Sequence, residues 1–412
     1  MKRTINIFNI QNKNVIIYLF SDLLAKALPF LFIPILTMYL NPEQYGNISL
    51  FNIGVEIFVI FIIMGGNSYY KIEYFNFENP ISSLYNIIFN VTLLFAMALF
   101  FSVPLYLYFD SVYLFKILPI ILLCAYLQSL LYLYISYYQC NEKALIVGGI
   151  NLFFSLCNSL LMIFLLSYME MNESSRYLSF AVSLMISVLL SSLLLGFKNK
   201  VKISAKINVS LLKFGVGIFP HAISWWARSG VERLLIGWYL SISSLGIYSL
   251  AMQLTSLMPL LCNAINQALM PKIVRSLNEK KICETKKILF KATAIVMVVC
   301  VTSSFAMPML LRYFLDHRYF EALTYLPYMI LVFIFQSVIV LYSNILYFYK
   351  NVKYLSSVTF CTSCLHICLA IILLKNSFNI YSVIISSAIT FLIASSLVFR
   401  KAMLLMRDDY DI

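Results

Sequence analysis

The sequence predicts an all-α integral membrane protein with about twelve transmembrane helices, in two parallel-repeat lobes of six helices, with both termini in the cytoplasm. Composition, charge distribution and an internal repeat support this prediction. Of the 412 residues, 62% are hydrophobic and 11% are charged, whereas soluble domains are about 45–50% apolar and about 25% charged. No soluble core could bury so much apolar surface, so lipid is the expected solvent.

Twelve apolar segments divide the chain, each about 20–28 residues long, which suffices to cross a hydrocarbon core of about 30 Å. The loops between them are short, and the sequence contains neither a soluble domain nor a phosphate-binding GxxxxGK[ST] loop. ATP hydrolysis by this chain is therefore not expected. The segments cover roughly residues 15–40, 47–70, 82–109, 114–139, 144–168, 177–197, 212–240, 245–270, 288–311, 322–349, 354–374 and 378–399.

The Lys and Arg residues are distributed unequally between the two sides of the predicted membrane. Twenty-two of the 30 fall on the side that holds both termini, five on the other side and three inside the apolar segments. The positive-inside rule therefore places both termini in the cytoplasm. The net charge of +13 is explained as a topology signal, so it does not indicate nucleic acid as a partner.

Twelve residues near the start of the chain reappear in register 200 positions later. Residues 39–50 (YLNPEQYGNISL) and 239–250 (YLSISSLGIYSL) are identical at five positions. Because each half holds an even number of segments, both halves have the same orientation and the repeat is parallel. The predicted domains are a first six-helix lobe at 1–197, a cytoplasmic basic linker at 198–212 and a second six-helix lobe at 213–412. Such a repeat is typical of transporters.

Helix-disturbing residues lie in the first and seventh segments, which correspond to each other in the two halves. The first contains Pro29 and Pro34, and the seventh contains Gly215, Gly217 and Pro220. Interrupted helices at corresponding places indicate a binding site. Equally, Pro and Gly are common in membrane helices without such a role.

Six ionisable residues lie inside the apolar segments. A charge at the bilayer centre costs about 2.5–3.5 kcal/mol, so such residues are expected to face a partner or a wet cavity. All but Glu56 are on the first and seventh segments. The six residues are Asp22, Lys26, Glu56, Arg228, Glu232 and Arg233.

The three cations are the candidate substrate-binding residues. Lys26, Arg228 and Arg233 lie at different depths and could contact an anionic group along a path across the membrane, since the planar guanidinium of Arg binds phosphate oxygens bidentately. The alternative is that Asp22–Lys26 and Arg228–Glu232, each spaced i, i+4, are neutralised pairs that only hold helices together. Glu232 cannot neutralise both arginines, which favours a functional role for the seventh segment.

The acidic residues Asp22, Glu56 and Glu232 are candidates for a supporting or coupling role. Glu56 lies alone on the second segment and could pair with an arginine or titrate as a coupling site. No catalytic constellation, metal site or cofactor motif is predicted. Cys361 and Cys364 form a CxxC pattern, but His366 is their only nearby partner, so packing is the better interpretation.

The sequence resembles the polysaccharide transporters, that is, the O-antigen and lipid-linked-oligosaccharide flippases of the multidrug/oligosaccharidyl-lipid/polysaccharide exporter superfamily. The resembling features cover most of the chain, and the family usually has Asp where this chain has Glu232. The features that carry the resemblance are Lys26 on the first segment and four short motifs. The motifs are Leu40-Asn-Pro-Glu-Gln-Tyr-Gly46, Glu232-Arg233-Leu-Leu-Ile-Gly237, Leu245-Gly-Ile-Tyr-Ser-Leu-Ala251 and Met270-Pro-Lys272.

The resemblance implies a multi-pass protein of the bacterial inner (cytoplasmic) membrane, with two lobes around a central cationic cavity. Its substrate would be undecaprenyl-diphosphate-linked oligosaccharide, an O-antigen or similar surface polysaccharide unit, flipped from the cytoplasmic to the outer leaflet. Lys26, Arg228 and Arg233 would contact diphosphate or acidic sugars. Besides membrane lipid, polysaccharide polymerase and chain-length proteins of lipopolysaccharide biosynthesis are the partners to consider.

Two alternatives remain open. An ion-coupled multidrug exporter of the same superfamily would extrude organic cations and should have an acid-rich cavity, whereas cations exceed acids on the first and seventh segments. A polytopic polysaccharide polymerase should have a long outer segment, and no predicted outer loop exceeds about a dozen residues. The sequence therefore favours a transporter over an enzyme.

Cysteine accessibility tests the predicted topology. In a background in which the nine native cysteines are replaced by serine, we expect a membrane-impermeant thiol reagent to label Glu43→Cys only from outside and Lys281→Cys only from the cytoplasmic side, because the basic loops stay inside. Labelling of both positions from one side would refute the topology.

Overall fold

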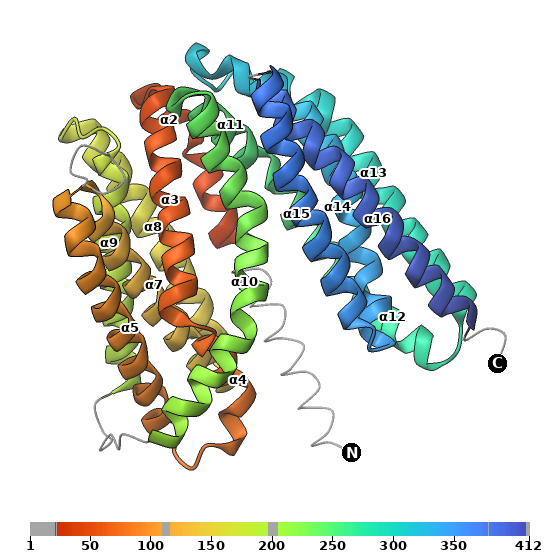
Figure 1. Cartoon of the computed structure of the whole chain (residues 1–412), viewed down its shortest axis with the longest axis horizontal. Helices are drawn as coiled ribbons and strands as arrows, with labels where there is room; N and C mark the ends of the chain where they lie inside the picture. Colours follow the sequence, from red (N-terminus) through yellow and green to blue (C-terminus); the bar gives the residue numbers. More distant parts are fainter. Residues whose placement is uncertain (1–20, 22, 109–115, 197–204, 378, 409–412) are drawn as a thin grey trace. The chain divides into compact units, whose positions relative to one another are not determined.

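The computed structural model describes residues 21, 23–108, 116–196, 205–377 and 379–408. This part of the chain is helical and contains no β-strand (Figure 1). Ten helices within it are long and apolar enough to cross a membrane. The predicted class, an all-α multi-pass membrane protein, is therefore confirmed.

Helices occur where the apolar segments predicted them. The shorter apolar helix Leu23–Tyr39 represents the first segment, and α10 represents the seventh. In the first half the elements are α2 (Ile33–Tyr39), α3 (Pro42–Ile63), α4 (Gly66–Glu73), α5 (Pro80–Tyr108), α7 (Leu118–Cys140), α8 (Ala144–Tyr168) and α9 (Ser174–Leu195). In the second half they are α10 (Ala205–Tyr239), α11 (Ile242–Thr255), α12 (Leu257–Asn278), α13 (Ile282–Leu311), α14 (Phe320–Phe348), α15 (Val352–Ser377) and α16 (Tyr381–Asp408).

Several helices extend beyond the predicted segments into the basic loops. For example, α13 begins at Ile282 and α16 ends at Asp408, outside the predicted 288–311 and 378–399. Hydropathy detects only the part of a helix that lipid surrounds, whereas backbone hydrogen bonds continue into polar sequence. The number of membrane crossings and the location of the termini stay predictions.

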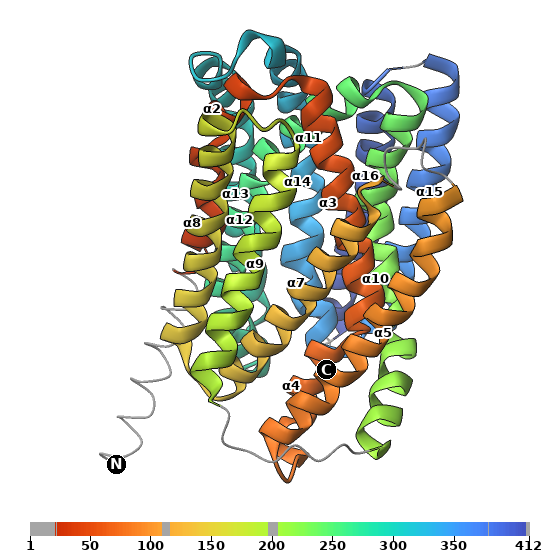
Figure 2. The same cartoon turned by 90° about the vertical axis from the view of Figure 1, so that its left-hand side faces the viewer.

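The chain folds into two compact units. The first unit comprises Met1–Leu40 and Asn47–Trp226, and the second comprises Asn41–Gly46 and Ala227–Ile412. Within the first, α7 packs against α5, α8 and α9, and within the second, α14, α15 and α16 lie side by side (Figures 1 and 2). The units divide inside α10. The predicted linker at 198–212 stays a prediction, since residues 198–204 fall outside the described residues.

The two segments with helix-disturbing residues behave differently. In the first segment the helix is interrupted by a turn at Phe32, between Pro29 and Pro34, and Pro34 stands in the first turn of α2. By contrast, α10 is continuous and contains Pro220 in its interior. Membrane helices tolerate such a proline because neighbouring groups and local adjustments compensate for its missing N–H. One turn later, the Ser224 hydroxyl donates to the Pro220 carbonyl at 2.7 Å.

One glycine in α10, Gly215, allows close packing in the first unit. A Cβ atom on Gly215 would lie 2.5 Å from the Met64 carbonyl oxygen, at the turn between α3 and α4. In that turn Gly65 has φ +72, a left-handed conformation that glycine adopts without steric cost. Gly215 therefore allows the turn to approach the α10 backbone, and no break of the helix is needed to explain it.

The two copies of the repeat begin α3 and α11 with capped first turns. Asn41 Oδ1 accepts from the Gln44 backbone N–H at 2.8 Å, and Gln44 Oε1 accepts from the Asn41 N–H at 2.9 Å. At the equivalent positions, Ser241 Oγ accepts from the Ser244 N–H at 3.0 Å. Both copies thus satisfy donors that a helix start leaves without partners.

The starts of α3 and α11 also contact each other, within the second unit. A Cβ atom on Gly46 would lie 2.0 Å from the Ile242 carbonyl oxygen, and one on Gly246 would lie 1.8 Å from the Pro42 carbonyl oxygen. Positions 42 and 242, like 46 and 246, are equivalent in the repeat, so the contact is reciprocal. Glycine is required at both places because any side chain would overlap backbone.

A glycine substitution at this contact should destabilise the protein. We expect Gly246→Ala to lower the melting temperature of the purified protein in detergent, with a cost of about 1–3 kcal/mol or more from overpacking against backbone that cannot move aside. In the matched control Gly217→Ala, a Cβ meets nothing within 4 Å. The control should melt at or slightly above the wild-type temperature, since Ala favours helix over Gly. Equal melting of the two variants would contradict the close contact.

Candidate functional site

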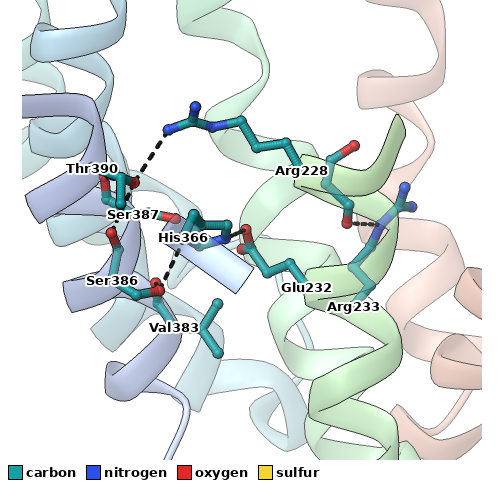
Figure 3. Close-up of polar contacts among 9 residues, drawn as sticks. Arg228, Glu232, Arg233, His366, Val383, Ser386, Ser387 and Thr390 are labelled. Atoms are coloured by element: carbon teal, nitrogen blue, oxygen red, sulfur yellow. Dashed lines mark hydrogen bonds and ion pairs between the residues drawn. The ribbon is translucent and has the colours of Figure 1, made fainter. Parts of the chain in front are cut away.

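A buried polar cluster lies in the second unit, where the C-terminal part of α10 packs with α15 and α16 (Figure 3). Its centre is an acid–imidazole pair: Glu232 Oε2 on α10 lies 3.0 Å from His366 Nε2 on α15. Glu232 is 6% exposed and His366 is 1% exposed. Burying a carboxylate is costly unless it is paired and hydrogen-bonded, so this pair accounts for the presence of Glu232 inside an apolar helix.

The second ring nitrogen of His366 is held by α16. The Ser386 hydroxyl oxygen lies 3.0 Å from His366 Nδ1, and the same hydroxyl donates to the Val383 carbonyl at 2.8 Å. One turn further on, the Thr390 hydroxyl donates to the Ser386 carbonyl at 2.9 Å. Contacts at both nitrogens fix the orientation of the imidazole ring.

Arg228 approaches the cluster from one turn earlier on α10. Its Nη2 donates to the Thr390 hydroxyl at 3.2 Å, and the guanidinium carbon lies 3.7 Å from the centroid of the Phe391 ring. Its Nε atom is buried without a hydrogen-bond partner. Among the described residues, Arg228 forms no ion pair with a carboxylate. Its direct contacts are a hydroxyl and an aromatic face, the latter a cation–π contact, and Glu232 attracts it electrostatically from one turn away.

The two arginines of the seventh segment do not share Glu232 as a hydrogen-bonding partner. Arg233 Nε donates to the Ser229 carbonyl at 3.1 Å, on its own helix, while the Glu232 carboxylate bonds to His366 (Figure 3). The i, i+4 pair Arg228–Glu232, one of the two sequence interpretations, does not form a salt bridge here. Arg228 and Glu232 still lie one helical turn apart on the same helix.

The remaining sequence candidates lie in the first unit. Lys26 is exposed on a helix that packs against α8, where the Ser155 hydroxyl donates to the Ala25 carbonyl at 2.7 Å. Glu56 is exposed on α3 and interacts electrostatically with Tyr132 of α7. Asp22 lies outside the described residues. Arg228, Glu232 and Arg233 therefore lie on one helix of the second unit, whereas Lys26 and Glu56 belong to the first.

Sequence reasoning missed the partners of this helix, namely His366, Ser386, Thr390 and Phe391. It considered His366 only beside Cys361 and Cys364, which are exposed free thiols on α15. The available signal was that a histidine inside an apolar segment is itself an intramembrane ionisable residue. Among the described residues, no group of three or more His, Cys, Asp or Glu side chains is arranged to hold a metal ion.

The apolar helices of the described chain define a polytopic membrane protein, and sequence comparison gives the family. Residues 12–277 match the family described as "Polysaccharide biosynthesis protein". This match covers more than half of the chain, so the chain belongs to that family. Residues 218–372 also match the family described as "MatE". In Haemophilus influenzae, protein 1 of the Lsg locus is 23% identical over 283 residues, which are 66% of this chain and 67% of that protein.

Solved structures with a similar fold are transporters. An inward-facing multidrug resistance MATE family transporter of the MOP superfamily superposes with a TM-score of 0.74 at 12% identity, covering 94% of this chain and 96% of that one. The lipid II flippase MurJ, in an inward closed conformation, gives a TM-score of 0.71 at 15% identity, covering 98% and 91%. The chain thus belongs to the polysaccharide biosynthesis family and has the fold of these transporters.

The contact between Arg228 and Phe391 can be measured by a double-mutant cycle. We expect Phe391→Leu to destabilise the wild-type protein by about 0.5–2 kcal/mol more than it destabilises Arg228→Gln, because the cation–π attraction exists only when both partners are present. Melting temperatures of the four proteins in one detergent give the difference. Equal effects in both backgrounds would show that the ring contributes packing alone.

Proposed function

We propose that this protein is a flippase for undecaprenyl-diphosphate-linked oligosaccharide, an O-antigen or similar surface polysaccharide unit. It would move this substrate from the cytoplasmic to the outer leaflet of the bacterial inner membrane by alternating access between two lobes. The observation that carries the proposal is Arg228, a guanidinium within an apolar helix. Its Nε donor has no hydrogen-bond partner, and among the described residues it forms no salt bridge with a carboxylate.

A charge placed in this way is suited to an anionic group. An arginine that only held helices together would be expected to pair with Glu232, which is one turn away, yet that carboxylate is bound to His366. The guanidinium therefore keeps hydrogen-bonding capacity for a ligand, and a diphosphate offers oxygens that match its planar donors. Arg233 and Lys26 are the further candidates for contact with diphosphate or acidic sugars, and Asp22, Glu56 and Glu232 are candidates for support or coupling.

The family match and the solved structures of similar fold also support a flippase. The chain belongs to a family described by polysaccharide biosynthesis, and one protein of similar fold is a flippase for lipid II. A chain of this family that flips a lipid-linked oligosaccharide would supply a polysaccharide polymerase and chain-length proteins at the outer leaflet, so these are its proposed partners.

The second candidate is an ion-coupled multidrug exporter. The match of residues 218–372 to the MatE family and the fold shared with a multidrug resistance transporter favour it. An exporter of organic cations would need acidic side chains free to meet the drug. In the described part of the second unit, the intramembrane acid Glu232 is already bonded to His366, and this favours the flippase.

Replacing either arginine should stop polysaccharide export. We expect Arg228→Ala and Arg233→Ala to reduce surface polysaccharide by about 10-fold or more, because a lost charge-assisted hydrogen bond is worth about 1.5–3 kcal/mol. The measurement is surface polysaccharide on cells that lack the chromosomal copy, with membrane protein quantified by immunoblot.

The matched control is Arg275→Ala, which removes a highly exposed guanidinium that forms a salt bridge with Glu279 at 2.8 Å. It should export normally, since an exposed pair of this kind contributes little. Normal export in both Arg228→Ala and Arg233→Ala would contradict the cationic path, and drug resistance lost in place of polysaccharide would favour the multidrug exporter.

A further inference from the structure

We propose that the corner between α12 and α13 binds an anionic phospholipid, with lysines holding its phosphate and the exposed face of α13 lying along its acyl chains. The ligand is a diacyl lipid with a negatively charged headgroup, such as phosphatidylglycerol. The site uses none of the residues of the buried polar cluster. It concerns a lipid of the surrounding bilayer, whichever substrate the protein moves.

Positive charge is concentrated at this corner. Residues 272–291 include seven Lys or Arg and two Glu. The Glu279 carboxylate pairs with Arg275 at 2.8 Å and with Lys281 at 2.6 Å. The other five cations form no salt bridge with a carboxylate of the described residues, so their charge is available to an anion. They are Lys272, Lys280, Lys286, Lys287 and Lys291.

Some of these lysines surround an open hollow. Its volume is about 390 Å³, and it is lined by Lys280, Lys281, Ile282, Cys283, Glu284 and Lys287. Three lysines against one glutamate leave the hollow with a net positive charge. Ammonium groups donate hydrogen bonds to phosphate oxygens and attract their charge. A phosphate-bearing headgroup therefore complements this hollow.

Buried contacts fix the shape of the corner. The hydroxyl oxygens of Ser276 on α12 and Thr285 on α13 lie 2.6 Å apart, and the Lys281 backbone N–H donates to the Ser276 carbonyl at 2.8 Å. Leu277 and Ile282 are fully buried beside them. The backbone that carries the lysines is thus arranged before a ligand binds, which lowers the entropy cost of binding.

The acyl chains fit the exposed face of α13. This helix is the least buried of the ten candidate spans, since 17% of its apolar stretch is buried. Phe290, Val298, Val301 and Phe305 follow Lys287 at helical spacing and are 71%, 62%, 42% and 73% exposed. One leaflet is about 15 Å of hydrocarbon, or about ten helical residues. Phe290 and Val298 therefore accompany the lipid whose headgroup meets Lys287.

A comparison with α5 shows that lysines are not needed to expose a helix to lipid. Only 22% of the apolar stretch of α5 is buried, and Phe89, Leu93 and Met97 are among its exposed residues. Yet α5 contains no Lys or Arg. Topology requires basic loops on one side, but it does not require them beside one lipid-exposed helix. Basic segments at a membrane surface attract anionic headgroups, so α13 is suited to select the charge of its lipid.

Melting of the purified full-length protein in detergent tests the proposal. A ligand that binds only the folded state raises the melting temperature as it saturates the site, so a titration gives an apparent affinity. We expect phosphatidylglycerol to raise the melting temperature. Phosphatidylcholine with the same acyl chains and inorganic phosphate at the same concentration should not, because each lacks one half of the ligand. Equal stabilisation by either would overturn the proposal.

Two double variants test the headgroup contact. Lys280→Gln/Lys287→Gln should weaken the apparent affinity for phosphatidylglycerol about 10-fold or more. The matched control Lys350→Gln/Lys353→Gln removes the same charge from the turn before α15 and should bind normally. Lys280 and Lys350 have φ +53 and φ +54, so any backbone effect is also matched. Equal losses in the two variants would show diffuse attraction to charge and would refute a site.

Two phenylalanine variants test the acyl-chain contact. Phe290→Ser should weaken binding of phosphatidylglycerol, whereas Phe305→Ser should change it little. The two rings are almost equally exposed, but Phe305 lies 15 residues further along α13, about 22 Å from Phe290. An unchanged affinity in Phe290→Ser, or an equal loss in both, would contradict the site. Each variant is compared with itself without lipid, and no readout depends on export, so failure of the flippase function is a separate result.

Discussion

Hydrocarbon solvates neither charge nor backbone polar groups, and this constraint governs the whole molecule. Every membrane-crossing element must satisfy its N–H and C=O groups internally, which explains why the described chain is helical. The same constraint requires each buried charge to find partners inside the protein. Glu232 meets it through His366, and Arg228 meets it only partly, through a hydroxyl and an aromatic ring. These two buried charges therefore lie where helices α10, α15 and α16 meet.

The incomplete hydrogen bonding of Arg228 connects the fold to the proposed function. A fully paired arginine would stabilise the helix packing and would have little reason to bind anything else. Here a buried donor without a partner persists because neighbouring contacts hold the side chain in place. A site that lacks part of its own hydrogen bonding can gain it from a ligand, which is the physical basis of the role proposed for Arg228.

The apolar segments of the sequence were sufficient to predict the helices and the membrane class, since hydropathy and helix length follow from the lipid environment alone. They also located Arg228, Glu232 and Arg233, because charges are rare in such segments. The partners could not be predicted in this way. His366 lies 134 positions from Glu232, and no periodicity indicates which helices become neighbours. Likewise Gly215 suggested a helix break, whereas its contact with Met64 depends on how the chain folds back.

The reciprocal contact of the two glycines gives a physical reason why both segments of the predicted repeat have glycine at this place. Where two copies of a repeat lie apart, each can drift independently until their common origin is lost. At Gly46 and Gly246 the backbone of each segment lies against the other. A larger residue at either position would therefore overlap the backbone of the other segment. Each segment thus restricts the other to glycine at positions 46 and 246, and the similarity of the two segments is kept where they are in contact.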